Sequence, residues 1–299
     1  MSEQNRLRFF ASAARIFHLW PLITKTGIYS HYRRKKHPGT LLYLDVVITE
    51  CCSLRCRDCA NLMQYYRNPQ NLDIEEVIRS LGRILMSFRI GQLHILGGEP
   101  FVSQKNLIRL LEFINEESGD RVDKIIINTN GTIVPSEECL NIMKKTRNLE
   151  LIFSNYGELS SKMGEFTQLC TKEEIEHHSL NEEVWWDFGD LRPREENERS
   201  TQQRYDECFS RRHCTTLYRG KLYVCPRQAH ATHLGIIPET DSENVDVLRT
   251  DYSDPMVLRD DVYALLDRKK RISTCKHCGC NSRKKIPRAV QAERTIDVC

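Results

Sequence analysis

Cys52, Cys56 and Cys59 are the residues whose types and spacing are best suited to chemistry. They follow a C-x3-C-x2-C pattern. On a loop this short, three thiolates can bind three irons of one [4Fe–4S] cube and leave the fourth iron without a protein ligand. An iron with an open coordination position can bind a small molecule, so the spacing predicts a reactive cluster. The alternative is zinc, which favours four closed ligands, often in two C-x2-C pairs, and fits this spacing poorly.

The elements around these cysteines are predicted to form an α/β fold. An apolar, β-branched run at residues 41–48 precedes the cysteine loop and predicts a buried strand. Further short apolar runs at 93–96, 124–128 and 149–153 alternate with helical patterns. This alternation predicts a parallel sheet with right-handed crossovers. Active sites of such folds lie at the carboxyl ends of the strands, where the cysteine loop is placed.

Four helices are expected between and after these strands. Asp73 with Glu76 forms a capping-box-like start for the first helix, which has one apolar face. Ser103 is expected to cap the second helix, and the third follows Pro135-Ser136. The fourth is expected near residues 160–170.

Three more motifs follow strand signals in an order that points to a family. Gly97-Gly98-Glu99-Pro100 follows the second apolar run, Ile127-Asn128-Thr129-Asn130-Gly131 the third and Phe153-Ser154-Asn155-Tyr156-Gly157 the fourth. With the cysteine loop, the chain resembles a radical S-adenosylmethionine (radical SAM) enzyme over residues 41–157. Asp58 departs from the pattern, because many members have an aromatic residue there, against the adenine.

The resemblance implies a fold, a cofactor and residues that bind it. The implied fold is a partial (β/α)6 TIM-like barrel over residues 41–205, with its fifth and sixth units placed loosely between 174 and 206. The first motif would hold the SAM amino group, and the later polar residues its ribose and carboxylate. The implied SAM-binding residues are Gly97, Gly98, Glu99, Pro100, Asn128, Thr129, Asn130, Ser154 and Asn155. The reduced cluster would cleave SAM to a 5′-deoxyadenosyl radical that abstracts a substrate hydrogen, and a flavodoxin- or ferredoxin-type protein would donate the electron.

Six further cysteines lie beyond Tyr205: Cys208, Cys214, Cys225, Cys275, Cys278 and Cys280. A hairpin turning near Arg219-Gly220 is predicted to deliver Cys225 to a site shared with the later cysteines. This pattern resembles the SPASM and twitch extensions of radical SAM enzymes, so we expect a small domain over 206–299 with one auxiliary [4Fe–4S] cluster. The expected ligands are Cys214, Cys225, Cys275 and Cys278, with Cys208, Cys280 and His277 as alternates, since spacing does not decide among them. Zinc is the alternative here, because C-x2-C pairs commonly bind it.

Trp185, Trp186, Asp187 and Arg192 are candidate substrate residues. Aromatic rings that alternate with charges suit stacking on, and hydrogen bonding to, a sugar or similar polar ring. The alternative is that the paired tryptophans belong to the core or to a lid.

Several functions fit these features. An auxiliary cluster that accepts an electron allows oxidation of a small polar substrate such as a sugar, an aminocyclitol or a nucleotide-linked sugar. Return of hydrogen from a thiol would give epimerisation, and modification of a ribosomally made peptide is a further alternative. A function of another class is zinc and nucleic-acid binding through the runs Arg33 to Lys36 and Arg283 to Lys285. Iron and sulfide analysis, with SAM cleavage under dithionite, separates the enzyme from the binding module.

The composition indicates the class of protein and the cellular compartment to expect. The 299 residues are 40% apolar and 28% charged, with a net charge of +3 that by itself indicates neither nucleic-acid nor membrane binding. Thirteen cysteines without an apolar export signal in the first residues predict a cytoplasmic metalloprotein. Residues 1–40 are expected to form a helical segment ending near Leu19, followed by a basic run at 31–37.

Overall fold

The structure is a computed structural model that describes residues 39–293, except 182, 253 and 281–283. The expected helix ending near Leu19, the basic run at 31–37 and Arg283 lie outside the described residues.

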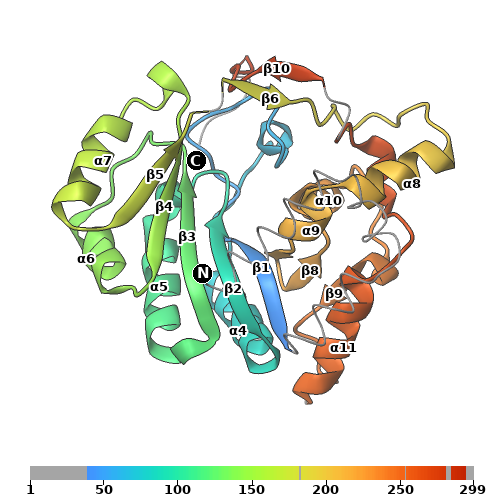
Figure 1. The fold of residues 1–299 in the computed structure, drawn as a ribbon, viewed down its shortest axis with the longest axis horizontal. Coiled ribbons are helices and arrows are strands. Elements are labelled where there is room, and N and C mark those ends of the chain that lie inside the picture. Colours follow the sequence, from blue (N-terminus) through green and yellow to red (C-terminus); the bar gives the residue numbers. More distant parts are fainter. Residues whose placement is uncertain (1–38, 182, 253, 281–283, 294–299) are drawn as a thin grey trace, which may run out of the picture.

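A mixed sheet of eight strands organises the described chain, in the order β5-β4-β3-β2-β1-β7-β8-β9 (Figure 1). Its first five strands are parallel to their neighbours and are β1 (Thr40–Val47), β2 (Arg89–Leu96), β3 (Val122–Thr129), β4 (Leu149–Ser154) and β5 (Glu176–Leu180). Their crossovers contain α4 (Ile74–Ser87), α5 (Gln104–Glu117), α6 (Glu137–Lys145) and α7 (Met163–Lys172). The parallel strands with their helices confirm the predicted partial β/α barrel.

Short polar side chains begin two of these helices as expected. The Asp73 carboxylate accepts hydrogen bonds from the backbone N–H groups of Glu75 and Glu76, and Ser136 Oγ accepts one from Cys139. The capping prediction for Ser103 was wrong, because its side chain makes no capping bond. The 3-10 helix η2 (Pro100–Ser103) runs directly into α5, so its own turn precedes the α-helix.

The predicted hairpin joins the barrel sheet. β7 (Thr216–Tyr218) and β8 (Lys221–Tyr223) are antiparallel, and Arg219 and Gly220 between them both have positive φ, as a two-residue hairpin turn requires. β7 pairs parallel with β1, and β9 (Asn244–Asp246) pairs antiparallel with β8. The cysteine-rich part therefore extends the barrel sheet past β1, and the buried side chains of Leu217 and Leu222 lie in the same hydrophobic core as β1.

The sixth barrel strand differs from the expectation. β6 (Val184–Trp186) lies in a separate two-stranded sheet with β10 (Lys285–Pro287), so β5 is the edge of the main sheet. β6 is only three residues long, and its partner comes about a hundred residues later in the chain. Figure 1 shows β6 and β10 crossing above the end of the barrel at which the cysteine loop lies.

Shorter elements complete the described chain. The remaining α-helices are α8 (Glu198–Glu207), α9 (Ser210–His213), α10 (Pro226–His233) and α11 (Pro255–Leu266). The other 3-10 turns are η1 (Met63–Tyr65), η3 (Gly119–Arg121), η4 (Gly157–Leu159), η5 (Asp241–Glu243) and η6 (Ser273–His277).

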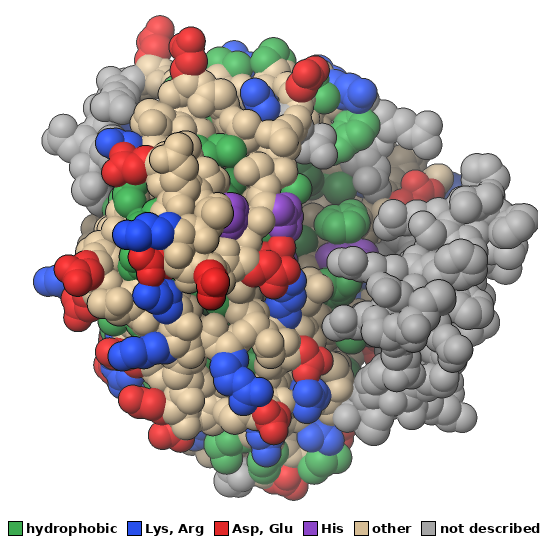
Figure 2. Space-filling view, turned by 60° about the vertical axis from the view of Figure 1, so that its left-hand side comes forward, with side chains coloured by type: hydrophobic (Ala, Val, Ile, Leu, Met, Phe, Trp, Pro, Cys, Tyr) green, Lys and Arg blue, Asp and Glu red, His purple; other side chains and the backbone are tan. Residues whose placement is uncertain are grey.

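Among the described residues, no helix has the length and apolar composition needed to span a membrane. Basic and acidic side chains are interspersed over the face in Figure 2.

Candidate active site at the cysteine loop

The three cysteines of the C-x3-C-x2-C pattern lie together in the loop after β1. Their thiols are close enough to interact electrostatically, and Cys56 is buried while Cys52 and Cys59 are partly buried. Burial raises the pKa of all three thiols, that of Cys56 to about 11. Without a metal, thiols with raised pKa values stay protonated. A bound metal deprotonates the thiols that ligate it. This donor set therefore fits an iron–sulfur cluster, whose cationic core would stabilise the three thiolates.

Two glycines allow β2 to end against the cysteine loop. Gly98 N–H donates to the Thr49 carbonyl at 3.0 Å, and Glu99 N–H donates to the Cys51 carbonyl at 2.8 Å. A Cβ at Gly98 would lie 2.3 Å from the Cys51 carbonyl oxygen and 2.7 Å from Cys52 Cβ. A Cβ at Gly97 would lie 2.6 Å from the Thr49 side chain. Only residues without a side chain fit this approach.

Glu99 connects the ends of β2 and β3. Its carboxylate is 1% exposed and accepts hydrogen bonds from Phe101 N, Thr129 Oγ1 and Asn130 N at 3.2, 2.9 and 2.7 Å. Burial raises the pKa of Glu99 to about 7 against the opposing effect of these donors. The side chain is thus held in one orientation beside the cysteine loop.

Asn130 joins β3 directly to the cysteine loop. Its Nδ2 lies 3.8 Å from Cys52 Sγ and donates to Ser53 Oγ at 3.1 Å. Its Oδ1 accepts from the Thr132 hydroxyl at 2.7 Å, which orients the amide. Of the predicted SAM-binding residues, Glu99, Thr129 and Asn130 therefore form one connected group next to Cys52.

The other predicted SAM-binding residues lie farther along the same strand ends. Asn128 contacts His94 on β2, with 3.3 Å between Nδ2 and Nδ1. Asn155 follows β4 and donates from Nδ2 to Asn181 Oδ1 at 2.7 Å. Ser154 is the last residue of β4, and Pro100 begins η2. All of them are at or near the carboxyl ends of β2, β3 and β4.

The C-terminal segment covers the cysteine loop, which the sequence analysis missed. Cys56 and Gln291 form an antiparallel bridge, with Arg57 N–H donating to Val290 O at 2.7 Å and Ala292 N–H donating to Arg55 O at 2.8 Å. Gln291 Nε2 lies 3.3 Å from Cys56 Sγ, and its Oε1 accepts from Arg55 N at 2.8 Å. We call residues 285–292, which contain β10 and this bridge, the strap. No local motif predicts the strap, because its partners are distant in the chain: β6 lies about one hundred residues earlier and the cysteine loop more than two hundred.

Five cysteines of the C-terminal region line a second cavity. They are Cys208, Cys225, Cys275, Cys278 and Cys280. Cys208 Sγ and Cys280 Sγ are 3.6 Å apart, and Cys280 N–H donates to Cys278 Sγ at 3.4 Å. Hydrogen bonds from Cys280 lower the pKa of the Cys208 and Cys278 thiols to about 7 and about 6. The donor set suits a second iron–sulfur cluster, because it holds more thiols than one cube requires.

The structure distinguishes Cys214 from the other expected ligands. Cys214 does not line this cavity, although its thiol interacts electrostatically with Cys225, Cys208 and Asp45 on β1. Cys208 and Cys280, named as alternates, do line it. The third alternate, His277, turns its Nδ1 to the Leu191 carbonyl at 2.8 Å and lines a different pocket.

Zinc and iron–sulfur clusters place different demands on ligand spacing. In the described part of the chain, no three His, Cys, Asp or Glu side chains are arranged to hold one metal ion. A zinc ion draws its sulfurs to about 2.3 Å from a single centre. Thiolates around a [4Fe–4S] cube each bind a different iron and are spaced more widely.

The candidate substrate residues are separated by the structure. Trp185 packs edge-on against Tyr156, whose hydroxyl interacts electrostatically with the three loop cysteines. Trp186 is 53% exposed, with Lys285 Nζ 5.7 Å from its ring centroid. Trp185 alone of the pair therefore lies near the cysteine loop.

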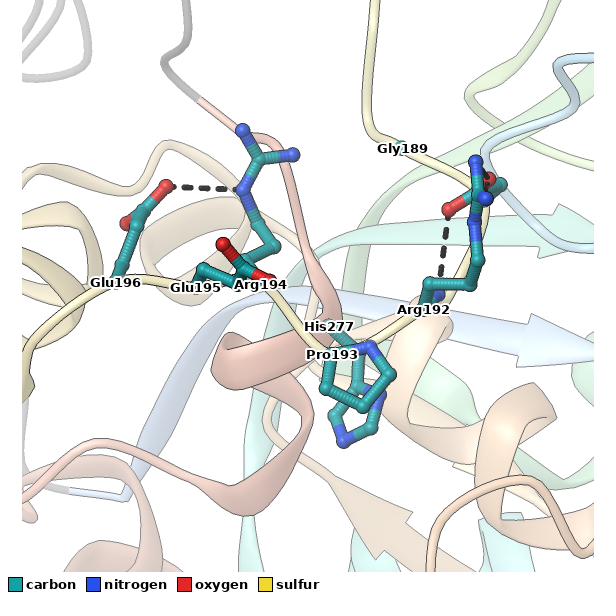
Figure 3. A pocket seen from close by; sticks show the side chains of 8 residues that line it. Gly189, Arg192, Pro193, Arg194, Glu195, Glu196 and His277 are labelled. Atoms are coloured by element: carbon teal, nitrogen blue, oxygen red, sulfur yellow. Dashed lines mark hydrogen bonds and ion pairs between the residues drawn. The ribbon is translucent and has the colours of Figure 1, made fainter.

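Asp187 and Arg192 follow β6 and are held by neighbours. Asp187 accepts from Lys284 Nζ at 2.8 Å, and Arg192 Nε donates to Asp190 at 2.6 Å. Arg192 lines an open polar pocket with Arg194, Glu196 and His277 (Figure 3). In this pocket Arg194 is paired with Glu196 at 2.9 Å.

A buried polar network, also missed by the sequence analysis, links the cysteine loop to the hairpin. Glu50 is 2% exposed and accepts from Tyr218 Oη at 2.5 Å and from an Arg219 terminal nitrogen at 2.6 Å. Tyr66 lies between Tyr218 Oη and His230 Nδ1, at 3.2 and 2.7 Å. Glu50, two residues before Cys52, was the available signal, because a carboxylate directly after a buried strand needs partners.

Residues 46–153 match the sequence profile of the Radical SAM superfamily. This part of the chain is a radical SAM domain. A radical SAM domain implies SAM and a [4Fe–4S] cluster, in agreement with the three-thiol loop after β1.

Curated relatives share only part of their length with the chain. A GTP 3′,8-cyclase of Syntrophomonas wolfei is 35% identical over 104 residues, which cover 33% of this chain and 29% of the relative. The GTP 3′,8-cyclase of Erythrobacter litoralis is 32% identical over 91 residues, covering 30% and 27%. The chain thus spans less than a third of the length of these relatives.

Two solved structures share the fold over most of the chain. BtrN in complex with AdoMet and 2-DOIA aligns with a TM-score of 0.51 at 15% identity, covering 81% of this chain and 95% of BtrN. The anSMEcpe enzyme with bound AdoMet and Kp18Cys peptide aligns with a TM-score of 0.52 at 13% identity, covering 87% and 93%. At these identities the likeness shows the fold.

Proposed function

We propose that this radical SAM enzyme cleaves SAM reductively at a cluster held by Cys52, Cys56 and Cys59, and oxidises a small polar substrate. One observation carries the proposal: a three-thiol loop lies at the carboxyl ends of the parallel strands. A second cavity, lined by five thiols, supports it. When bound, SAM and the reduced cluster supply a hydrogen-abstracting 5′-deoxyadenosyl radical.

The chain's own residues would position these groups. Gly97 and Gly98 let the β2 end approach the cluster loop, and Glu99 fixes Thr129 and Asn130 beside Cys52. Polar groups at the ends of β3 and β4 would bind the ribose and carboxylate of SAM. Trp185 and Tyr156 would cover the substrate side and exclude water.

The second cavity decides which reaction we favour. We propose one auxiliary [4Fe–4S] cluster bound by four of Cys208, Cys225, Cys275, Cys278 and Cys280. These thiols would hold a cluster that supplies a one-electron acceptor. A substrate alcohol would then lose a hydrogen atom to the 5′-deoxyadenosyl radical, an electron to this acceptor and a proton to solvent, a net two-electron oxidation to the carbonyl. Epimerisation would instead need a thiol placed to return a hydrogen atom.

The substrate class is proposed from the polar surroundings. A sugar, an aminocyclitol or a nucleotide-linked sugar suits the polar groups near β6. The names of relatives support testing such compounds, since one is a cyclase of GTP and one neighbour was solved with 2-DOIA. The neighbour solved with a peptide makes a peptide the competing class.

Anaerobic assay tests the activity. Reconstituted protein with SAM and dithionite is expected to release 5′-deoxyadenosine, and Cys56→Ala is expected to abolish release. Cys170→Ala is the matched control, because Cys170 is fully buried in the hydrophobic core away from both thiol groups. Protein that binds zinc but neither iron nor sulfide would contradict the proposal.

Substrate class needs a second experiment. Deuterated GTP, a nucleotide-linked sugar, an aminocyclitol and a short peptide are each turned over, and deuterium is sought in 5′-deoxyadenosine. Label from a small polar compound, with an oxidised product, supports the proposal. Label only from the peptide would assign the enzyme to peptide modification.

A further inference from the structure

Arg227 is a buried cation between the two cysteine sites. It lies in the first turn of α10, two residues after Cys225, and is 5% exposed. One terminal nitrogen donates to the Ala60 carbonyl at 3.4 Å and the other to the Gly189 carbonyl at 2.5 Å. Its Nε is buried and has no hydrogen-bond partner. The side chain lines the cavity of five cysteines.

Among the described residues, no carboxylate pairs with Arg227. Its neighbours differ in this respect: Arg204, which lines the same cavity, pairs with Glu196, and Arg211 lies 3.8 Å from Asp206. An isolated buried charge is strongly unfavourable unless an opposite charge compensates it. Arg227 therefore needs an anion that the acidic side chains around it do not provide.

The cysteine sulfurs of both sites are the groups within reach that become anionic when a cluster binds them. Ala60, which accepts from Arg227, directly follows Cys59 in the cysteine loop. The guanidinium interacts electrostatically with the thiols of Cys59 on one side and Cys278 on the other. A [4Fe–4S] cube with thiolate ligands is an anion, so a loaded site would supply the missing counter-charge.

We propose that Arg227 is a positioning residue whose counter-ions are the two clusters, and that its charge raises the reduction potential of both. The inference rests on the proposed function, since it needs a cluster at each site. One-electron reduction adds one negative charge to a cluster, and a buried cation nearby stabilises that state. Arg227 would thereby favour electron acceptance at the auxiliary cluster and tie the cysteine loop to α10.

Redox titration of the reconstituted holoenzyme tests the proposal, with reduced clusters followed by electron paramagnetic resonance. SAM alters only the signal of the cluster that binds it, which separates the two clusters. Arg227→Gln, which removes the charge, is expected to lower both midpoint potentials, more at the auxiliary cluster. Arg227→Lys keeps the charge and is expected to stay near wild type. Arg211→Gln is the matched control, because Arg211 lies outside the cavity lining.

Each possible result of this titration either supports or overturns the proposed role of Arg227. Unchanged midpoints in loaded Arg227→Gln would overturn the inference. If Arg227→Gln fails to retain the auxiliary cluster, retention by Arg227→Lys supports a charge role, whereas loss from both variants shows a role of shape and overturns it. Failure of the proposed function appears separately, as wild-type protein without two clusters or without SAM cleavage.

Discussion

Single residues set how closely the strand ends approach the cysteine loop. Gly98 is the clearest case, because the space for its side chain is already taken by Cys51 and Cys52. Glu99 and Asn130 act in the same region through hydrogen bonds. The position of the cysteine loop therefore depends on the absence of a side chain at Gly98 as much as on the polar side chains of Glu99 and Asn130.

Gly98→Ala is expected to displace the cysteine loop. The added methyl would lie 2.3 Å from the Cys51 carbonyl oxygen, so we expect a loss of about 1–3 kcal/mol in the free energy of unfolding. Iron content after reconstitution should fall with it. Gly164→Ala is the control, because a Cβ there has no neighbour within 4 Å and its helical site favours alanine. Equal iron content in the two variants would contradict this account.

His94 is expected to make the free energy of unfolding depend on pH. Burial lowers the pKa of His94 from 6.5 to about 4, so the unfolded chain takes up a proton at a higher pH than the folded chain does. The stabilising contribution is full above pH 6.5 and is lost as the pH falls toward 4. His94→Gln, which cannot titrate, is expected to reduce the loss of unfolding free energy between pH 7.5 and 5.5 by about 1 kcal/mol. Urea unfolding at the two values measures it, and an unchanged slope would contradict the assignment.

Among the elements, the strap is the one that contacts the cysteine loop from the far end of the described chain. β10 pairs with β6, and the residues that follow pair with the cysteine loop, so one segment connects the candidate substrate side to Cys56. Arg288 adds a hydrogen bond to the Asn155 carbonyl at 2.8 Å. The strap thus contacts the loop of the cluster and the end of β4 together.

Gln291→Glu tests whether the strap protects the cluster. The carboxylate keeps an acceptor for Arg55 N–H but replaces the donor to Cys56 Sγ with a negative charge. We expect faster bleaching of the iron–sulfur absorbance in air. Gln168→Glu on the exposed face of α7 is the control for the added charge. Bleaching at the wild-type rate would show that the side-chain bond to Cys56 has no protective role.

For the whole molecule, the main sheet is shared between the barrel and the cysteine-rich region. β7 covers the edge of β1, and Leu217 on β7 and Leu222 on β8 lie in the common core. An uncovered edge strand beside exposed apolar side chains favours aggregation. The two regions are therefore expected to depend on each other for folding.

A chain that ends at residue 205 tests this dependence. It keeps β1 to β6 but loses β7 to β10, so we expect it to aggregate while the full chain stays monodisperse. Size-exclusion chromatography and urea unfolding measure the difference. A soluble fragment with a cooperative unfolding transition would show that residues 41–205 form an independent unit.

Local patterns predicted much of the barrel and the first thiol group. The strand that contains Leu44, the Asp73 cap and the turn at Arg219-Gly220 were all predictable, because each depends on neighbours in the sequence. The cap at Ser103 was not, because the preceding 3-10 helix replaces it. The pairing of β6 with β10 was not predictable, since the two strands are distant in the chain.

The sequence by itself determined the three-cysteine loop and the parallel strands that carry it, because these follow from spacing and periodicity. Gly97 and Gly98 were expected from the family resemblance, and only the structure showed that they make room for the loop. The tertiary structure alone decided which cysteines surround the second cavity, which cation lies between the two sites and which segment covers Cys56. Those contacts join residues far apart in the chain. Their selection depends on packing and on compensation of buried charge, which no local pattern records.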